Sequence, residues 1–519
     1  MEILSYFFDY YQCWIGSFFG LIVLWYIYFT WDFDYWKKQG VPGEKPYILI
    51  GTLKPTWKYT IQDRDMEAMK KFGHIHGAFL GSVPVLFISD PELLRQVLVK
   101  DFPAFRNRLN IANMDKDKIM GNMLSVMKDE KWKMVRNTLS PTYTSGKLKQ
   151  MVVLVEECCQ NLTRSLKTEA ESGAPINFAK KFPLLTLDII ASVAFGMKIN
   201  CIDNPDTEFV VTAQKAFRGN VKLFYFLFIF SFFFKWFPNI IGRPFKYFAT
   251  IANQAIDLRL KNKDFTRKDF LQIMLEAEMP SDETKDGQTT GPKKTLTRDV
   301  VVSQTILFIL AGHETTANTI NFIAYELAQN QDIQDKLIKE VDEVMTNFKG
   351  RLSYDGVASM QYLDMVVSET LRKYPPAVRL DRVCEEEGYK LNEGVSLRKG
   401  MQIAVPVYAI HHNPEFYPNP NVFNPERFSP EMKADRNPFT YLPFGEGPRN
   451  CIAKRFALLE AKLVIVHMLY NYRFQTCKET DYPLKMYMGT GLLQPESVKL
   501  VLQKRMDQPH FDENVEVNQ

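Results

Sequence analysis

The stretch Pro443-Phe444-Gly445-Glu446-Gly447-Pro448-Arg449-Asn450-Cys451-Ile452-Ala453-Lys454-Arg455-Phe456 lies near the C-terminal end of the chain. Gly445 and Gly447 permit positive φ angles, so we expect a tight turn that lets a flat partner approach closely. Cys451 follows this turn at the predicted start of a helix, where backbone N–H groups and the helix dipole favour a thiolate. Arg449 is placed to pair with a carboxylate on the group that the sulfur binds. A thiolate on such a turn is typical of a ligand to haem iron.

An isolated cysteine at a helix start is more often a small buried side chain than a metal ligand. The surrounding pattern favours the ligand, because it resembles the haem-binding signature of the cytochrome P450 family of haem-thiolate monooxygenases. Phe444, Gly447, Arg449 and Cys451 match the signature, whereas Ala453 stands where the family usually has glycine. The resemblance implies that Cys451 binds the iron of haem b (iron protoporphyrin IX). It also implies that the other three matching residues contact this cofactor.

The composition excludes several classes of protein. The chain has 519 residues, of which 46% are hydrophobic, and no shift in composition divides it into separate globular domains. A formal net charge of +4 is too small to indicate nucleic-acid binding. The seven cysteines are an odd number without paired spacing, which favours a reducing compartment over a disulfide framework.

The N-terminal segment predicts a membrane anchor. From Tyr10 to Trp31 there are 22 residues without a charged side chain, and as a helix they would span about 33 Å, enough to cross a bilayer. Lys37 and Lys38 follow this run, which places the body of the protein in the cytosol. A buried core helix or a cleaved signal peptide is less consistent with the interfacial aromatics and the missing cleavage site. The resemblance implies the endoplasmic reticulum membrane, with a single N-terminal anchor and a cytosol-facing catalytic domain.

The expected domain organisation follows from these features. We expect a membrane anchor at 1–36, a turn-rich linker at 37–46, a haem-thiolate catalytic domain at 47–506 and a disordered tail at 507–519. Within the catalytic domain, residues 75–80 and 83–89 are predicted to form two strands. Gly81-Ser82 lies between them, so we expect a hairpin. Asp90 and Pro91 then predict the cap and first turn of a helix. The resemblance implies a mainly α cytochrome P450 fold with a smaller β part.

Several basic residues are candidates to bind the cofactor. Trp132 and Arg136 are four residues apart on one predicted helix face, where both can donate to an anionic group. An ordinary amphipathic helix with a surface cation is the alternative. The resemblance implies that this pair contacts the haem propionates, and that Arg382 and, with weaker support, Arg108 do the same.

A long apolar helix is predicted from residue 297 to about 330, and its middle carries the polar sequence 311–316. Polar and small residues are unfavourable inside a buried helix. Thr315 can donate to a carbonyl one turn earlier and, with Gly312, open a local distortion beside the iron. A helix–helix contact through small residues is the alternative. The pattern resembles the family's oxygen-activation motif, which implies that Glu314 and Thr315 deliver protons; His313 occupies a variable position and receives no role.

A further group of charges is expected to support the cysteine loop. Glu369 and Arg372 share a helix face, and Arg427 follows later in a turn-rich segment. Alone, such a pair is a common surface ion pair of little energetic weight. The resemblance implies a buried triad with a structural role.

The aromatic stretch at 217–245 is expected to be a lid over an apolar site, dipped into the membrane surface, although core packing is the simpler interpretation. By position in the family, the ranges expected to line the pocket are 106–127, 217–248, 308–316, 377–382 and 487–494. Their apolar content indicates a lipophilic small-molecule substrate, either a xenobiotic or an endogenous lipid or steroid.

The resemblance implies an NADPH- and O2-dependent monooxygenase that inserts one oxygen atom into such substrates. The chain has no glycine-rich dinucleotide fingerprint after a strand, so electrons are expected from NADPH-cytochrome P450 reductase, with cytochrome b5 as a possible second donor. The surface patch expected to bind these partners consists of Lys131, Lys133, Lys454 and Arg455. The alternatives are a haem-thiolate isomerase or synthase acting on peroxides without reductase, and a non-enzymatic haem sensor or carrier. The intact pair Glu314 and Thr315 favours the monooxygenase.

Overall fold

The computed structural model describes residues 2–52, 58–109, 111–217, 242–261, 269–278, 296–391, 394–488 and 491–509. Two sequence predictions therefore lie largely outside the described residues. They are the aromatic lid, of which 218–241 are not described, and the C-terminal tail from residue 510 onward.

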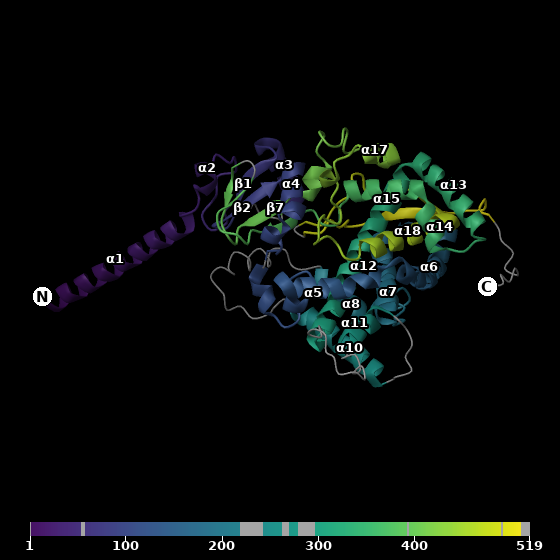
Figure 1. Cartoon of the computed structure of the whole chain (residues 1–519), viewed down its shortest axis with the longest axis horizontal. Helices are drawn as coiled ribbons and strands as arrows, with labels where there is room; N and C mark the ends of the chain where they lie inside the picture. Colours follow the sequence, from purple (N-terminus) through teal and green to yellow (C-terminus); the bar gives the residue numbers. More distant parts are fainter. Residues whose placement is uncertain are drawn as a thin grey trace, which may run out of the picture.

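Helices make up most of the described chain, as the sequence predicted, and Figure 1 shows them forming a body from which α1 projects as a long rod. The α-helices are α1 (Glu2–Thr30), α2 (Tyr35–Lys38), α3 (Ile61–Phe72), α4 (Pro91–Arg95), α5 (Asp129–Leu139), α6 (Ser145–Ser172), α7 (Phe178–Phe195), α8 (Glu208–Phe217), α10 (Gly242–Lys261), α11 (Phe270–Glu278), α12 (Arg298–Gln329), α13 (Gln331–Asn347), α14 (Tyr354–Ser359), α15 (Gln361–Lys373), α16 (Val407–His411), α17 (Pro430–Ala434) and α18 (Lys454–Asn471).

The smaller β part consists of short sheets. The strands are β1 (Ile75–Leu80), β2 (Val83–Ile88), β3 (Ile176–Asn177), β4 (Leu380–Val383), β5 (Tyr389–Lys390), β6 (Ser396–Leu397), β7 (Gln402–Val405), β8 (Tyr472–Gln475) and β9 (Lys499–Lys504). The largest sheet has the order β1-β2-β7-β4, and the others are β3-β9-β8 and β5-β6. The predicted hairpin is confirmed, since β1 and β2 pair antiparallel with Ile75 opposite Ile88. The predicted helix start is also confirmed, because Asp90 caps α4 by accepting a 2.9 Å hydrogen bond from Leu93 N–H.

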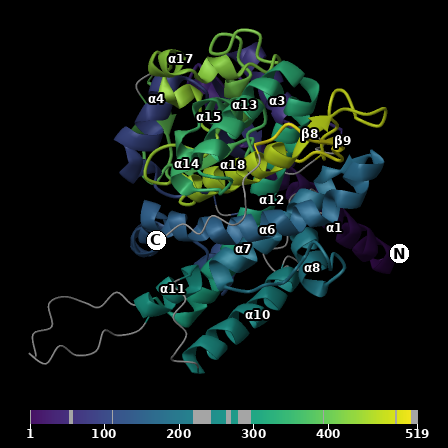
Figure 2. The same ribbon diagram turned by 90° about the vertical axis from the view of Figure 1, so that its right-hand side faces the viewer.

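The helix α12 forms the centre of the body, where it packs against α7 and α18 (Figure 2). Its apolar side chains are buried around the whole helix rather than along one stripe, which is typical of a core helix. It is long and apolar enough to cross a membrane, but 72% of its most apolar window is buried inside the protein. The predicted bounds are confirmed. The helix assignment runs without interruption from Arg298 to Gln329, through the polar sequence 311–316.

The N-terminal helix α1 carries exposed apolar side chains from Trp14 to Tyr28. The chain then folds onto the largest sheet. Tyr35 and Trp36 of α2 are buried, and the Trp36 indole N–H donates to the Ala78 carbonyl over 3.1 Å. A Cβ at Gly77 would lie 2.2 Å from the Trp36 ring, so glycine is required at the position of β1 against which this indole packs. The segment that follows α1 is therefore part of the packed body.

Candidate functional site

The loop that carries Cys451 is a tight turn closed by its own backbone. Gly445 and Gly447 have φ angles of 70° and 79°, as expected for glycines that set a turn. The Cys451 N–H donates to the Phe444 carbonyl over 2.9 Å, which closes the turn just before α18 begins. A Cβ at Gly447 would lie 2.0 Å from the Leu98 carbonyl oxygen. The close approach at Gly447 is therefore to protein backbone, which the sequence did not indicate.

The Cys451 side chain is accessible and lies just before α18. Desolvation by surrounding protein raises the pKa of its thiol. A hydrogen bond from the backbone of Ala453 and the cations Arg136 and Arg108 lower the pKa, but by less than burial raises it. The local hydrogen bond and the nearby cations therefore act in the predicted direction, against the larger effect of burial. A bound metal ion is the kind of partner that would deprotonate this sulfur.

Arg449 belongs to the cysteine loop, and its side chain is buried. Its guanidinium donates to the Arg106 carbonyl over 2.9 Å and to the Met127 carbonyl, and it lies 4.8 Å from the centre of the Trp132 ring. Its Nε–H has no hydrogen-bond partner. Burial, with repulsion from Arg108 and Arg382, lowers the pKa of Arg449 to about 9.

The predicted face of α5 points toward the same loop. Trp132 is buried under Arg449, and Arg136 donates to the Asn450 carbonyl over 2.6 Å and to the Asn450 side chain over 2.8 Å. Trp132 and Arg136 are therefore brought to the cysteine loop together. Asn450 was not singled out in the sequence, although it directly precedes Cys451.

Arg382 and Arg108 complete a cluster of cations with Arg449 and Arg136, which we call the arginine cluster. Arg382 on β4 is 1% exposed, and burial followed by repulsion from Arg108 lowers its pKa to about 9. Its Nε–H has no partner, while Arg108 donates to the Arg449 carbonyl over 3.2 Å. Among the described residues, no carboxylate forms an ion pair with any of the four. Buried cations that repel one another fit an anionic ligand with more than one carboxylate, such as haem.

The middle of α12 turns small and polar groups toward accessible space. Ala311 is exposed although it lies within the core helix. Thr315 donates to the Ala311 carbonyl over 2.6 Å, which confirms the predicted bond to the preceding turn. Glu314 accepts a 2.9 Å hydrogen bond from Gln494 and lies 3.3 Å from His313. The sequence places Gln494 only in the range 487–494, which is expected to line the pocket. No local pattern marks it as the partner of Glu314.

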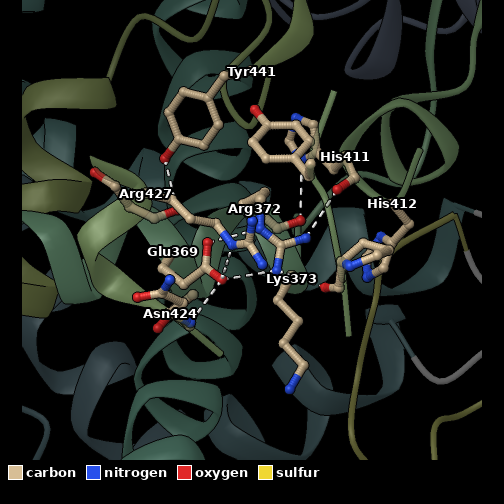
Figure 3. A network of polar contacts seen from close by, with 12 residues as sticks. Glu369, Arg372, Lys373, His411, His412, Asn424, Arg427 and Tyr441 are labelled. Carbon is tan, nitrogen blue, oxygen red and sulfur yellow. Dashed lines mark hydrogen bonds and ion pairs between the residues drawn. The ribbon is translucent and has the colours of Figure 1, made fainter. Parts of the chain in front are cut away.

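The predicted triad is assembled and buried, as Figure 3 shows. Arg372 donates to both Glu369 oxygens over 2.7 and 2.9 Å, and both side chains are fully buried. Arg427 approaches Glu369 to 3.4 Å from the later turn. The Glu369 carboxylate also accepts the Asn424 N–H over 3.0 Å, so it joins α15 to the segment that precedes the cysteine loop.

Together these contacts define a class of site: an accessible cysteine on a closed turn, beside buried and half-buried arginines for which the described residues provide no ion pair, in a mainly helical protein. Such a site fits a metal cofactor that carries anionic groups.

The comparison with known proteins gives the family. The sequence model of the family described as Cytochrome P450 matches residues 41–502, so the chain belongs to the cytochrome P450 family. It is 40% identical over 487 residues to Cytochrome P450 3A11 of Mus musculus, and 41% identical over 484 residues to Cytochrome P450 3A2 of Rattus norvegicus. It is also 38% identical over 487 residues to Cytochrome P450 3A5 of Homo sapiens. Each alignment covers 92% of this chain and 93% of the relative.

The predicted enzyme class is thereby confirmed, and the chain is a haem-thiolate monooxygenase of a type found in animals.

Proposed function

We propose that this protein is an NADPH- and O2-dependent monooxygenase that oxidises lipophilic small molecules at a haem b bound by Cys451. The observation that carries the proposal is the position of Cys451, which ends a closed turn whose Asn450 accepts hydrogen bonds from Arg136 of the arginine cluster. When bound, the haem activates dioxygen and transfers one oxygen atom to the substrate.

The chain's own residues position the cofactor. Cys451 provides the sulfur, whose proton leaves when the metal binds. The arginine cluster and Trp132 would bind the two propionates, whose oxygens would accept from the Nε–H groups of Arg382 and Arg449 that have no partner among the described residues. Gly447 lets the turn pack against the Leu98 carbonyl and so fixes the position of the Cys451 sulfur.

Two residues of α12 handle protons. The Thr315 hydroxyl donates to the Ala311 carbonyl, so its oxygen keeps a lone pair that can accept a proton from water and pass its own proton on. Glu314 is buried and oriented by Gln494, which holds an ionisable group one residue away from that hydroxyl. We assign Glu314 and Thr315 to proton delivery on the side that α12 presents.

The proposal includes a membrane and a redox partner. The exposed apolar helix α1 anchors the chain in the endoplasmic reticulum membrane, with the body on the cytosolic side. The patch formed by Lys131, Lys133, Lys454 and Arg455 is exposed and binds the acidic surface of NADPH-cytochrome P450 reductase, or of cytochrome b5. Substrate choice, xenobiotic or endogenous lipid, rests with the apolar pocket.

The test of the ligand is Cys451→Ser in the full chain. We expect this variant to lose the red-shifted carbon monoxide band of a thiolate-ligated ferrous haem, because a hydroxyl oxygen does not replace the thiolate. Cys477→Ser, which removes a half-buried cysteine from another loop, is the control and should keep the band. Survival of the band in Cys451→Ser would show that the ligand is another residue.

The test of the reaction is product formation with NADPH, reductase and dioxygen across a panel of lipophilic compounds. A product that requires both oxygen and reductase supports the monooxygenase, whereas rearrangement of a peroxide without either would support an isomerase or synthase. Lys133→Glu combined with Arg455→Glu should lower reductase-supported turnover and its salt dependence, with Lys70→Glu on α3 as the control. Unchanged turnover in the double variant would remove the patch from the proposal.

A further inference from the structure

His411 is a buried histidine that connects the triad to the cysteine loop (Figure 3). It is the last residue of α16 and is fully buried. Its Nδ1 lies 3.1 Å from the Arg372 carbonyl, and its Nε2 lies 2.8 Å from the Leu442 backbone nitrogen. Its own carbonyl accepts a 2.9 Å hydrogen bond from the Arg372 guanidinium. The residue therefore contacts Arg372 twice and the loop once.

The two ring contacts determine where the proton of this imidazole lies. A backbone N–H can only donate and a carbonyl can only accept, so Nε2 accepts from Leu442 and Nδ1–H donates to Arg372. Protonation of Nε2 would place two donors against each other. Burial, with the nearby His412 and the Arg372 cation, also holds the pKa of His411 well below its usual value. The ring is neutral and bridges the two segments in one tautomer.

Leu442 is the point at which the cysteine loop begins. Its side chain is buried, and its carbonyl accepts the Gly445 N–H over 3.0 Å at the first turn of the loop. Phe444, two residues later, closes the same loop on Cys451. The preceding residue is held as well, because the Tyr441 ring stacks on His411 at 5.6 Å and its hydroxyl donates to Ser368, next to Glu369. The chain from α15 to Cys451 is thus linked by direct contacts.

We propose that His411 is a positioning residue that transfers the rigidity of the triad to the thiolate loop. It holds the Leu442 N–H and with it the base of the turn that presents the Cys451 sulfur. In this role it sets how firmly the thiolate stays on the iron, without touching the cofactor. The inference rests on the proposed function of Cys451 as the haem ligand.

His412 shows why His411 is the informative residue of the two. It follows directly in the chain and is also buried, but its Nδ1 contacts the Tyr408 carbonyl at 2.9 Å, in its own turn. Its ring stacks on Tyr408 at 3.9 Å. Loss of the His412 ring therefore perturbs the same region and the same packing without removing a bond to the cysteine loop.

The experiment compares four variants of the haem-loaded full chain by the stability of the red-shifted carbon monoxide band. The variants are His411→Phe, His411→Asn, His411→Gln and His412→Asn. A glutamine amide reaches the position of Nε2 and can accept from Leu442, whereas an asparagine amide reaches only the position of Nδ1. The quantity measured is the rate at which the band converts to that of the unligated or neutral thiol form, in denaturant below the unfolding transition.

We expect conversion to be about five- to tenfold faster in His411→Phe and His411→Asn, because one buried hydrogen bond that anchors the loop is lost. His411→Gln and His412→Asn should remain within about twofold of the parent protein. Equal rates for His411→Asn and His411→Gln would overturn the proposal, as would a His412→Asn variant that converts as fast as His411→Phe. If His411→Phe does not fold, the conversion rates of His411→Asn and His411→Gln still test the proposal.

The two proposals can fail separately. Loss of the band in Cys451→Ser establishes the ligand whatever the His411 variants do. Retention of the band in Cys451→Ser would overturn both, since His411 would then hold a loop that does not carry the ligand.

Discussion

Two sets of buried arginines in this protein differ in what balances their charge. Arg372 is fully buried and makes a two-bond ion pair with Glu369, while its remaining N–H groups donate to the carbonyls of His411 and Pro420. Arg382 and Arg449 are buried to a similar degree, yet each keeps an Nε–H without a partner. Burial, followed by repulsion from Arg108, lowers the pKa of both to about 9.

The difference separates a structural element from a binding site. A buried ion pair that is complete within the chain serves the fold, because its charges and hydrogen-bonding groups are already satisfied. Buried like charges that no ion pair balances are unfavourable until an anion binds. The arginine cluster is therefore the part of this site that is completed by a ligand. Substitutions in the two sets should consequently have opposite effects on the haem-free protein.

The largest effect is expected from Glu369→Gln. It leaves the Arg372 charge buried without its carboxylate, and breaking a buried pair in this way destabilises a protein by about 3–5 kcal/mol. Denaturant unfolding of the purified protein measures the loss. The control is Glu426→Gln, which removes the partner of Lys336 in an exposed pair and should change stability by less than about 1 kcal/mol. Similar losses of stability in both variants would mean that burial of the triad does not increase its contribution to the free energy of unfolding.

The next effect concerns the loop itself. Gly447→Ala places a Cβ against the Leu98 carbonyl at a position with a φ of 79°, so both strain and a clash oppose folding. We expect a loss of about 2–4 kcal/mol together with weaker haem retention. Gly400→Ala has a φ of 83° but open space around the new Cβ, so it should show the strain alone, about 1 kcal/mol. If the two variants lose equal stability, the contact with Leu98 does not constrain the loop.

Local features of the site could be predicted from the sequence because they depend on neighbouring residues. The glycines of the turn, the cap at Asp90 and the bond from Thr315 to Ala311 all follow from residue type and spacing. The triad follows from the resemblance to a family, and the shared helix face of Trp132 and Arg136 follows from their spacing, whereas their convergence on the cysteine loop was not predicted. Composition and periodicity alone do not bring segments so distant in sequence together.

The features that could not be predicted depend on packing between distant segments. The Gly447 contact with Leu98, the bond from Gln494 to Glu314 and the bridge through His411 have no local signal. The thiol of Cys451 shows the same limit, since local N–H groups favoured a thiolate while desolvation by the whole fold raised its pKa. Burial is a property of the assembled protein, and it outweighed the local effect.

Arg382→Met is expected to change the stability of the haem-free protein in the opposite direction to Glu369→Gln. Removing a buried cation with an unpartnered Nε–H should leave the haem-free protein unchanged or more stable by about 1–2 kcal/mol, while haem dissociates faster. Arg379→Met is the matched control three residues earlier, because Arg379 is paired with the buried carboxylate of Asp65. That variant should destabilise the haem-free protein. Haem-free unfolding and haem transfer to a scavenger protein measure the two quantities, and a loss of stability in Arg382→Met would show that its charge is already balanced.

The smallest effect is a pH dependence beside the triad. Burial, with the Arg372 cation, lowers the pKa of His412 from 6.5 to about 3, so the unfolded chain takes up a proton that the folded chain does not. Stability from this group is complete above pH 6.5 and is lost as the pH falls toward 3, with a slope of at most about 1.4 kcal/mol per pH unit. His412→Asn should reduce the slope of unfolding free energy against pH between 6 and 4 by up to that amount. The lost stacking on Tyr408 shifts the curve without changing its slope. Desolvation lowers the pKa of His412 more than the Arg372 cation does, so Glu369→Gln should steepen the slope only slightly. Equal slopes in His412→Asn and the parent protein would show that His412 is protonated in the folded protein.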